Sequence, residues 1–317
     1  MSERNLRVVA LGGVHGLAAT LSSLRAITTE ITAIVTVADN GGSSGRLREE
    51  FSIYPPGDLR MALAALCSDD EWGRSWAEIM QYRYVSSGPL DGHAVGNLLL
   101  AALWNKGEGA IAGLDRVGAL LKVVGRVLPM AQEPLDIEAS FINSSGRFIV
   151  TGQVEVATAK GRLESLRVIP ENPTAEKESL LAISQADWVV MGPGSWFSSV
   201  LPHVLVPEQR LALSKCRAKK ILVLNLDSAN SNIGQDSQGE YSGYTPLEHI
   251  EILAKYAPDL NFDYVIADET LAWQSGEIKN HLSSTGGELV IGDIRDGTSP
   301  IHHDPKKLRS LFAHMAG

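Results

Sequence analysis

Glycines, hydroxyls and charged side chains gather in one stretch of this chain, between Val35 and Arg60. An apolar run ends in Asp39 and Asn40 and continues into GGSSGRLR, residues 41–48. Glycines let main-chain N–H groups approach a ligand closely, while hydroxyls and arginines supply further donors and positive charge. The pattern favours a flexible loop that binds a phosphate-bearing ligand; the alternative is an ordinary glycine-rich turn after a strand.

The segment PPGDLR, residues 55–60, follows this stretch and begins an amphipathic run that ends at Cys67. It predicts a helix over residues 59–67, with Asp58 as the N-cap residue. Arg60 then lies in the first helical turn, where the helix dipole disfavours positive charge. We therefore expect Arg60 to face a ligand phosphate or a carboxylate such as Asp39, and not solvent.

Two further glycine-rich turns each carry an apolar run into a helical one. GGVHG, residues 12–16, follows RVVAL, and GPGS, residues 192–195, follows DWVVM. In a doubly wound sheet such turns lie at the carboxyl ends of strands, where the N–H groups of a helix N-terminus bind phosphate. The first turn is neither GxGxxG nor a Walker A loop, so alone it is a weak signal. His15 either contacts phosphate or caps the helix, and Ser195 is placed to cap the second helix.

The sequence DGHAVGNLLLAALW, residues 91–104, joins polar residues to a strongly apolar helix. His93, Gly96 and Asn97 fall on one helical face at spacings of three and four residues. We interpret this face as a second wall of the pocket, where Gly96 allows close approach and Asn97 hydrogen-bonds a sugar or base. The alternative is a buried histidine that neighbouring protein groups satisfy.

Short apolar runs alternate with helical patterns through most of the 317 residues, which predicts an α/β fold. We expect a doubly wound, Rossmann-like, mostly parallel sheet within a single domain, residues 1–317. Between residues 125 and 170, alternating apolar residues separated by turn residues predict a small antiparallel β insertion. The loop over 227–244, rich in Asn, Ser and Gly, is expected to be mobile. The clearest expected strands are 7–11, 31–37, 187–191, 220–226 and 263–267.

Composition narrows the classes of function. The net charge of −9 and the pI near 5.4 argue against nucleic-acid binding, which needs clustered Lys and Arg. No segment reaches the roughly 20 apolar residues of a membrane span. Cys67 and Cys216 form no CxxC pair, so we expect free thiols and a cytoplasmic protein. His302 and His303 lack a third ligand at metal spacing, and a homodimer is the base expectation for oligomeric state.

Six motifs, taken together and in order, resemble the gluconeogenesis factor family, YvcK-like proteins related to the CofD 2-phospho-L-lactate transferases. They are GGVHGL, VTVADNGGSSGRLR, PPGDLR, GHAVGNLLLAAL, GPGSWFSSVLPHVLVP and GYTPLEHI. The resemblance covers about residues 7–270 and implies a Rossmann-like fold, binding of UDP-N-acetylglucosamine or UDP-glucose, and a bacterial role in carbon metabolism, cell shape and cell-wall homeostasis. The transferase relatives move a phospholactyl group from a lactyl-diphosphonucleoside to a deazaflavin, using magnesium.

The chain departs from the family's pattern in places that concern the site. Val14 replaces a glycine of the first turn, and Asn40 replaces an aspartate beside Asp39, which removes one carboxylate from a candidate magnesium site. Of the family's NxxTQPGET segment only Asn225 remains, and His302 stands where an arginine is expected.

Three hypotheses of function follow. The first is a UDP-sugar-binding regulator with a regulatory protein partner, in which the glycine turns hold phosphates, Asp39 and Asn40 contact the nucleoside or sugar, and Arg46 or Arg60 neutralises charge. The second is a phospholactyl transferase in which Asp39 binds magnesium or activates the acceptor hydroxyl. The third is a scaffold with a vestigial pocket.

The predicted ligand-binding residues are glycines of the turns and the polar side chains around them. They are Gly12, Gly13, His15, Asp39, Asn40, Gly41, Gly42, Ser43, Ser44, Arg46, Asp58, Arg60, His93, Asn97, Gly192, Gly194, Ser195 and Asn225. Asp39 is also the predicted metal ligand and, in a transferase, the catalytic residue, with Mg²⁺ as the candidate cofactor.

Overall fold

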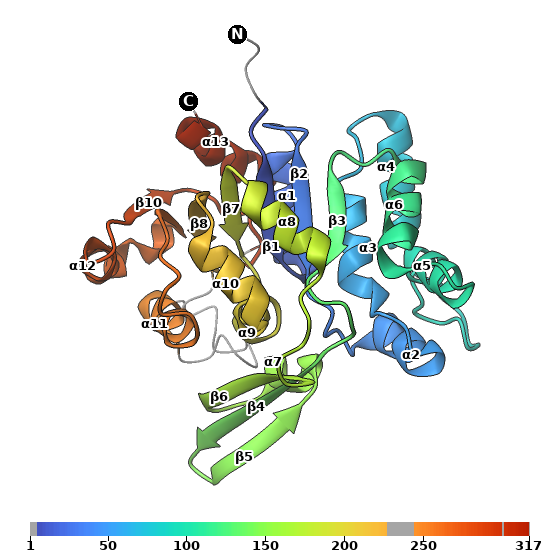
Figure 1. Ribbon diagram of the computed structural model, residues 1–317, viewed down its shortest axis with the longest axis horizontal. Coiled ribbons are helices and arrows are strands. Elements are labelled where there is room, and N and C mark those ends of the chain that lie inside the picture. Colours follow the sequence, from blue (N-terminus) through green and yellow to red (C-terminus); the bar gives the residue numbers. More distant parts are fainter. Residues whose placement is uncertain (1–4, 227–243, 300, 317) are drawn as a thin grey trace.

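Seven parallel strands form the central sheet of the computed structural model, which describes residues 5–226, 244–299 and 301–316 (Figure 1). Their spatial order is β10-β9-β8-β7-β1-β2-β3, and each neighbouring pair is parallel. The strands are β1 (Val8–Gly12), β2 (Ile31–Val35), β3 (Arg126–Pro129), β7 (Trp188–Met191), β8 (Lys219–Val223), β9 (Tyr264–Asp268) and β10 (Glu288–Gly292). This arrangement confirms the predicted doubly wound α/β fold.

Helices cover both faces of this sheet. The α-helices are α1 (Val14–Leu24), α2 (Gly42–Phe51), α3 (Pro56–Ala65), α4 (Glu71–Gln81), α5 (Val95–Asn105), α6 (Ala110–Leu121), α7 (Gln153–Thr158), α8 (Lys177–Gln185), α9 (Pro202–Leu205), α10 (Pro207–Lys215), α11 (Pro246–Tyr256), α12 (Ser275–Ser283) and α13 (Pro305–Ala316). A π-helix, η1 (Trp196–Val200), and a 3₁₀-helix, η2 (Glu269–Gln274), add to them. In Figure 1, α8 and α10 cross in front of the sheet, whereas α1 packs against α3 and α13.

The strand order reverses at β1, which has β2 on one side and β7 on the other. Leu11 of β1 lies opposite both Ile34 and Met191 in the register. All five residues of β1 are buried, as expected for a parallel strand covered on both faces. Ligands of such sheets bind in the crevice outside the carboxyl ends of the strands at this reversal. The fold therefore points to the chain that leaves β1 and β7.

A second, antiparallel sheet projects from one end of the molecule (Figure 1). Its strands are β4 (Asp136–Asn143), β5 (Gly146–Thr151) and β6 (Arg162–Ile169), in the order β5-β4-β6. The predicted insertion over 125–170 began too early, because β3 belongs to the large sheet and pairs in parallel with β2. Pro129 has no N–H to donate, and it is tolerated because β3 is an edge strand.

The starts of α2 and α3 differ from the sequence prediction. Residues 41–45 were expected to form a flexible loop, but α2 starts at Gly42, and the N–H of Gly45 donates to Gly41 O at 2.9 Å. A Cβ atom on Gly45 would lie 2.0 Å from the carbonyl oxygen of Asn40, so only glycine lets this turn close. Helix α3 starts at Pro56, because proline suits the first helical position. The prediction of Asp58 as N-cap is therefore wrong: it lies inside the first turn.

The small sheet is joined to the main core through aromatic side chains. Phe141 of β4 is fully buried and packs against Phe148 of β5 and Phe197 of η1, with ring centroids 5.8 and 6.1 Å apart. Phe197 in turn contacts Tyr244 at 5.6 Å. One continuous apolar cluster therefore includes residues of both sheets. The predicted mobile loop, 227–244, lies outside the described residues except for Tyr244.

Replacing Phe141 with alanine should destabilise the whole fold and not only the small sheet. We expect the free energy of unfolding to fall by about 3–5 kcal/mol, because the lost ring leaves a cavity between the two sheets. Urea denaturation followed by circular dichroism measures this change. The neighbouring Ile142, which is 44% exposed, provides the control: Ile142→Ala should change the free energy by less than about 0.5 kcal/mol. Equal losses in the two variants would contradict the shared core.

Candidate functional site

The two glycine turns at the ends of β1 and β7 lie directly against each other. A Cβ atom on Gly16 would be 2.2 Å from the carbonyl oxygen of Pro193, and one on Gly194 would be 3.6 Å from Gly13 O. The hydroxyl of Thr20, one turn further along α1, donates to Gly192 O at 3.0 Å. Both turns thus sit at the reversal point of the sheet, and their close approach needs a glycine at position 16.

The late turn is held in place by Asn225, which follows β8. Its Oδ1 accepts from the N–H of Gly194 at 2.9 Å, and its Nδ2 donates to Gly194 O at 2.8 Å. Gly192 and Gly194 both have positive φ, 76° and 149°, which other residues rarely adopt. Ser195 caps η1 as predicted, since its Oγ accepts from the N–H of Ser198 at 3.3 Å. Asn225 is therefore a positioning residue for this turn.

His203 contacts the main chain of the early turn. The sequence analysis did not predict this role. Its Nε2 lies 3.3 Å from Gly12 O, and its Nδ1 lies 2.8 Å from Nε2 of Gln209. That glutamine nitrogen also donates to the His203 carbonyl at 3.1 Å, so it donates to Nδ1 as well. His203 is then neutral and carries its proton on Nε2. Burial lowers the pKa of His203 to about 4. In the sequence, a histidine among the apolar residues of PHVLVP could have indicated this structural role.

Three side-chain oxygens converge on Gly13. A Cβ atom there would lie 2.6 Å from Asp58 Oδ2, 2.7 Å from Thr36 Oγ1 and 3.0 Å from Ser199 Oγ. Thr36 donates to Asp58 at 3.0 Å, whereas the buried Ser199 hydroxyl has no partner among the described residues. Asp58 therefore faces the early turn instead of capping α3. The sequence analysis did not predict a role for Thr36, which lies in an otherwise apolar run, or for Ser199, which follows another serine.

Asp39 lies between the first turns of α2 and α3. Its Oδ1 accepts from the N–H of Gly41 at 2.8 Å, and its Oδ2 is 2.4 Å from where a Cβ of Gly57 would be. The Ser44 hydroxyl accepts from the N–H of Gly57 at 3.0 Å and closes the contact between the two helices. Burial raises the pKa of Asp39, although hydrogen bonds from Gly41 and Ser44 and the charge of Arg48 oppose the rise.

These oxygens fit a magnesium ion in part. Mg²⁺ prefers oxygen ligands and is commonly bound by one or two carboxylates together with substrate phosphates. Asp39 and Asp58 both lie at the first turn of α3, and the hydroxyls of Thr36 and Ser199 are next to Asp58. No group of three or more His, Cys, Asp or Glu side chains suited to a metal occurs in the described part of the chain. An ion held here would therefore depend on ligand phosphates for further coordination.

Four predicted ligand-binding residues instead bond to one another in the protein interior. Arg60 Nε donates to Asn97 Oδ1 at 2.8 Å, and Asn97 Nδ2 donates to Ser43 Oγ at 3.0 Å. Ser43 Oγ also accepts from the N–H of Ala94, so its own hydrogen goes to His93 Nδ1 at 3.0 Å. All four side chains are buried. The chain of bonds ties α2 to α3 and α5 and corresponds to the alternative interpretation of His93.

Arg60 differs from the expectation in its partners. Besides Asn97, it donates to Gln81 Oε1, so it is buried among protein groups and does not lie open to a ligand. Burial lowers the pKa of Arg60 to about 10, with help from Arg83, whereas the charges of Asp58 and Asp39 oppose this. It remains protonated at neutral pH and contributes positive charge close to both carboxylates.

A cleft of about 1150 Å³ runs along the outer side of α2. Asn40, Gly42 and Arg46 line it, together with residues of the loop before α5. Arg46 donates to Asp91 O at 2.6 Å. Asn40 donates to Glu155 at 2.8 Å and accepts from the N–H of Val154 at 3.1 Å, so it anchors α7 of the insertion. The side chain of His15 lies outside the described part of the structure.

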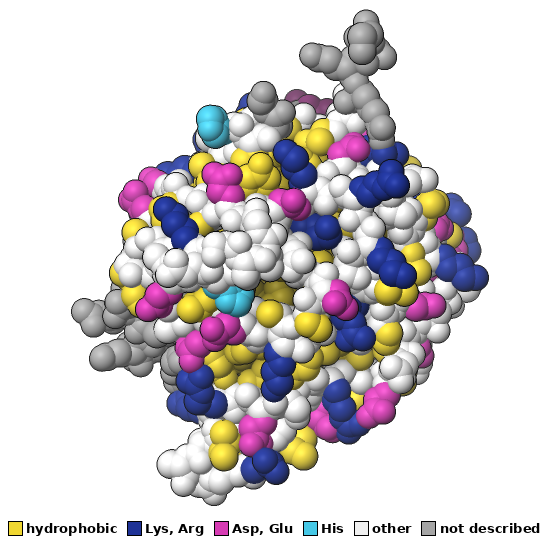
Figure 2. Space-filling model, turned by 60° about the vertical axis from the view of Figure 1, so that its left-hand side comes forward, with side chains coloured by type: hydrophobic (Ala, Val, Ile, Leu, Met, Phe, Trp, Pro, Cys, Tyr) yellow, Lys and Arg dark blue, Asp and Glu magenta, His cyan; other side chains and the backbone are white. Residues whose placement is uncertain are grey.

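The surface charges and the lengths of the helices are relevant to nucleic-acid and membrane partners. On the face drawn in Figure 2, Lys and Arg side chains are interspersed with Asp and Glu, and apolar side chains lie between them. No extended patch of one sign is visible on that face. Among the described residues, none of the helices is long and apolar enough to cross a membrane.

A model of the family described as 2-phospho-L-lactate transferase CofD matches residues 8–316. This protein belongs to the CofD family. A relative from Mycobacterium tuberculosis (strain H37Rv) is 44% identical over 312 residues, which cover 96% of this chain and 89% of the relative. A relative from Halalkalibacterium halodurans, named gluconeogenesis factor, is 36% identical over 253 residues, covering 80% and 74%. The crystal structure of a UPF0052 family member from Bacillus halodurans has a TM-score of 0.82 and 29% identity, covering 98% of this chain and all of that one. The predicted resemblance is confirmed.

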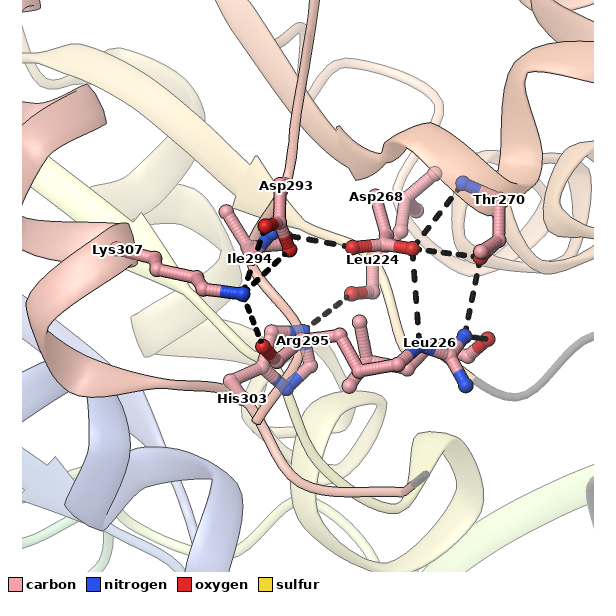
Figure 3. A network of polar contacts seen from close by, with 9 residues as sticks. All are labelled: Leu224, Leu226, Asp268, Thr270, Asp293, Ile294, Arg295, His303 and Lys307. Atoms are coloured by element: carbon pink, nitrogen blue, oxygen red, sulfur yellow. Dashed lines mark hydrogen bonds and ion pairs between the residues drawn. The ribbon is translucent and has the colours of Figure 1, made fainter. Parts of the chain in front are cut away.

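A second polar network of this CofD-family protein lies beyond the carboxyl ends of β8, β9 and β10 (Figure 3). Asp268, which ends β9, accepts from the N–H of Ile294 at 3.1 Å and from the hydroxyl of Thr270 at 2.6 Å. Burial alone would raise the pKa of Asp268, but these hydrogen bonds and the charge of Arg295 hold it below its ordinary value. Arg295 also donates to Leu226 O at 3.3 Å.

The same network fixes the C-terminal segment onto the sheet. Lys307 of α13 donates to both oxygens of Asp293, at 2.8 and 2.7 Å, and to Arg295 O at 2.9 Å (Figure 3). His303 lies 3.1 Å from Leu224 O through its Nε2 and is a structural group here. Of these tail residues, the sequence analysis considered only His303, as a possible metal ligand, because the tail reaches the strand ends only in the folded chain. The altered residues 227–230 lie outside the described part.

Acid should destabilise this CofD-family protein partly through His203. Its pKa falls from an ordinary 6.5 to about 4 on folding, so its contribution is complete above pH 6.5 and is lost as the pH falls from 6.5 to 4. The expected slope is about 1.4 kcal/mol per pH unit for one proton. Denaturant titrations between pH 4 and 7.5 measure it. His203→Gln keeps a donor near Gly12 and should lower the pH dependence of the unfolding free energy by the contribution of about one proton. His314→Gln, at an exposed position, should leave the slope unchanged; an equal effect would contradict this role.

Proposed function

We propose that this protein binds a UDP-sugar, UDP-N-acetylglucosamine or UDP-glucose, where β1 and β7 diverge, and acts as a regulator of carbon metabolism, cell shape and cell-wall homeostasis. The observation that carries the proposal is the contact between the two glycine turns at the reversal point of the sheet. A doubly wound sheet binds nucleotides at this place. The family and its members named gluconeogenesis factor support the same reading.

The chemistry of the turns suits a diphosphate. Helix α1 begins at Val14 with no side-chain cap, so its first N–H groups are available to an anion. The Ser199 hydroxyl faces the same turn without a protein partner. Asp39 and Asp58 would accept hydrogen bonds from hydroxyls of the nucleoside or sugar, or hold a magnesium ion on the diphosphate. The bound state then acts through a protein partner that recognises it.

One observation favours a second candidate, phospholactyl transfer of the CofD type. Although Asn40 replaces one family carboxylate, Asp39 and Asp58 both keep a carboxylate at the first turn of α3. In such a transfer the acceptor hydroxyl attacks the phosphorus of the phospholactyl group, a carboxylate takes its proton, and the bond to the departing nucleoside monophosphate breaks. Two carboxylates would allow one to take the proton while the other stays charged.

Calorimetric titration with UDP-N-acetylglucosamine and with GDP, each with and without Mg²⁺, separates these functions. Binding of the UDP-sugar that is indifferent to the metal is the result expected of a regulator. Binding of GDP that requires Mg²⁺ would overturn that role and favour the transferase. Absence of heat with both ligands would contradict both and leave the scaffold.

Asp39→Ala should weaken UDP-sugar binding at least tenfold, because it removes an acceptor from the first turns of α2 and α3. Asp58→Ala should do the same at the early glycine turn. Asp259→Ala, at an exposed position away from both turns, is the control and should keep the affinity of the unchanged protein. Circular dichroism and thermal unfolding establish that each variant is folded. Full affinity in both folded test variants would refute the placement of the site.

A further inference from the structure

The two edges of the small antiparallel sheet differ in how they are covered. At the β6 edge, the N–H of Leu163 donates to the Tyr244 hydroxyl at 2.5 Å, and the N–H of Leu166 donates to the Tyr256 hydroxyl at 2.7 Å. The other edge is β5, which lies on the outer side of the sheet, away from the large sheet (Figure 1). Within the described residues, one edge is therefore covered by two tyrosine side chains, and the other has no such cover.

The register shows which groups of β5 point outward. The strands β4 and β5 are joined by the two-residue turn 144–145, and Asn143 lies opposite Gly146. In the same register, the N–H of Gly152 donates to Ile137 O at 2.7 Å. Even-numbered residues of β5 thus direct their main-chain groups toward β4, and the odd-numbered ones direct theirs outward. The outward N–H and C=O groups of Arg147, Ile149 and Thr151 have no main-chain partner within the described chain.

The side chains along this edge do not discourage pairing. Phe148, Ile149 and Val150 form an apolar run at its centre, and Ile149 is 63% exposed. Edge strands of monomeric proteins are usually protected by lysine, proline, a bulge or a covering segment. The strand GRFIVT contains no lysine or proline, its one charged side chain, Arg147, is paired with Glu164, and its pairing with β4 is regular. An apolar, regular and uncovered edge suits addition of another strand.

We propose that β5 pairs antiparallel with β5 of a second copy of this chain, forming a continuous six-stranded sheet across a twofold axis. The segment Arg-Phe-Ile-Val-Thr has the same order of residue types in both directions: a polar residue at each end and three apolar residues between them. With Ile149 on the axis, the two Ile149 side chains face each other, and Phe148 of each copy lies opposite Val150 of the other. Arg147 faces Thr151, so no like charges are opposed. A partner of unrelated sequence would not need this symmetry.

The position of the hairpin allows such a pair. Strand β5 runs from the turn at Gly146 toward the body of the molecule, which it reaches at α7 (Figure 1). In an antiparallel pair the two bodies lie at opposite ends of the joined strands, so they do not compete for the same space. This pairing does not involve the turns after β1 and β7, so it is independent of the proposed ligand.

Sedimentation velocity of the full chain over a range of concentrations tests the association. We expect a monomer–dimer equilibrium, and Ile149→Lys should raise the dissociation constant at least tenfold because it opposes two ammonium groups at the axis. Leu181→Lys, on α8 and 56% exposed in the present structure, is the matched control and should leave the equilibrium unchanged. A monomer at every concentration, or equal dissociation by both variants, would overturn the proposal.

Disulfide trapping tests the register and uses a Cys216→Ser background, since Cys67 is buried. At Ile149→Cys the two Cα atoms would be about 5.5 Å apart, within the range of a disulfide. At Arg147→Cys they would be about four residues, roughly 13 Å, apart and should not link. A mixture of Arg147→Cys and Thr151→Cys should form the mixed dimer. Failure of Ile149→Cys to link, or equal linking of Arg147→Cys alone, would refute this pairing even if a dimer forms.

Discussion

The close contact between the turns after β1 and β7 is the constraint on which the rest of the candidate site depends. At the reversal of a doubly wound sheet the two chains must leave in opposite directions and yet stay close enough for one ligand to touch both. Gly16 satisfies this requirement because any side chain there would meet the carbonyl of Pro193. Asn225 and His203 then hold the two turns from either side, through main-chain atoms that carry no specificity of their own.

The polar residues around these turns form two groups with different roles. Asp39 keeps its carboxylate at the first turns of α2 and α3, and Asp58 keeps its own next to Gly13 of the early turn. The buried chain from Arg60 through Asn97 to Ser43 uses its hydrogen-bonding capacity inside the protein. Such a fully satisfied network rigidifies the helices that it joins. The second group therefore supports the first by fixing the positions of α2 and α3.

The small sheet adds a feature that the nucleotide-binding fold does not require. It is joined to the core through Phe141 and Phe197, while Asn40 connects its α7 helix to the end of the segment that carries Asp39. Because Asn40 directly follows Asp39, the insertion is attached to the chain next to a carboxylate of the candidate site. A twofold pairing through β5 would place this linkage at the centre of an assembly. The insertion would then connect the candidate site to the interface between two copies.

The sequence by itself determined the fold class, the family and the places where the glycine turns occur, because buried parallel strands read as continuous apolar runs and glycines mark the turns that follow. It placed Asp39 and Asp58 near the site but mistook Asp58 for a helix cap, since capping and ligand-facing carboxylates look alike in one dimension. Only the tertiary structure decided that His93 bonds within the protein and that His203 supports Gly12. Those contacts join residues far apart in the chain, and local pattern carries no information about which distant partner satisfies a buried polar group.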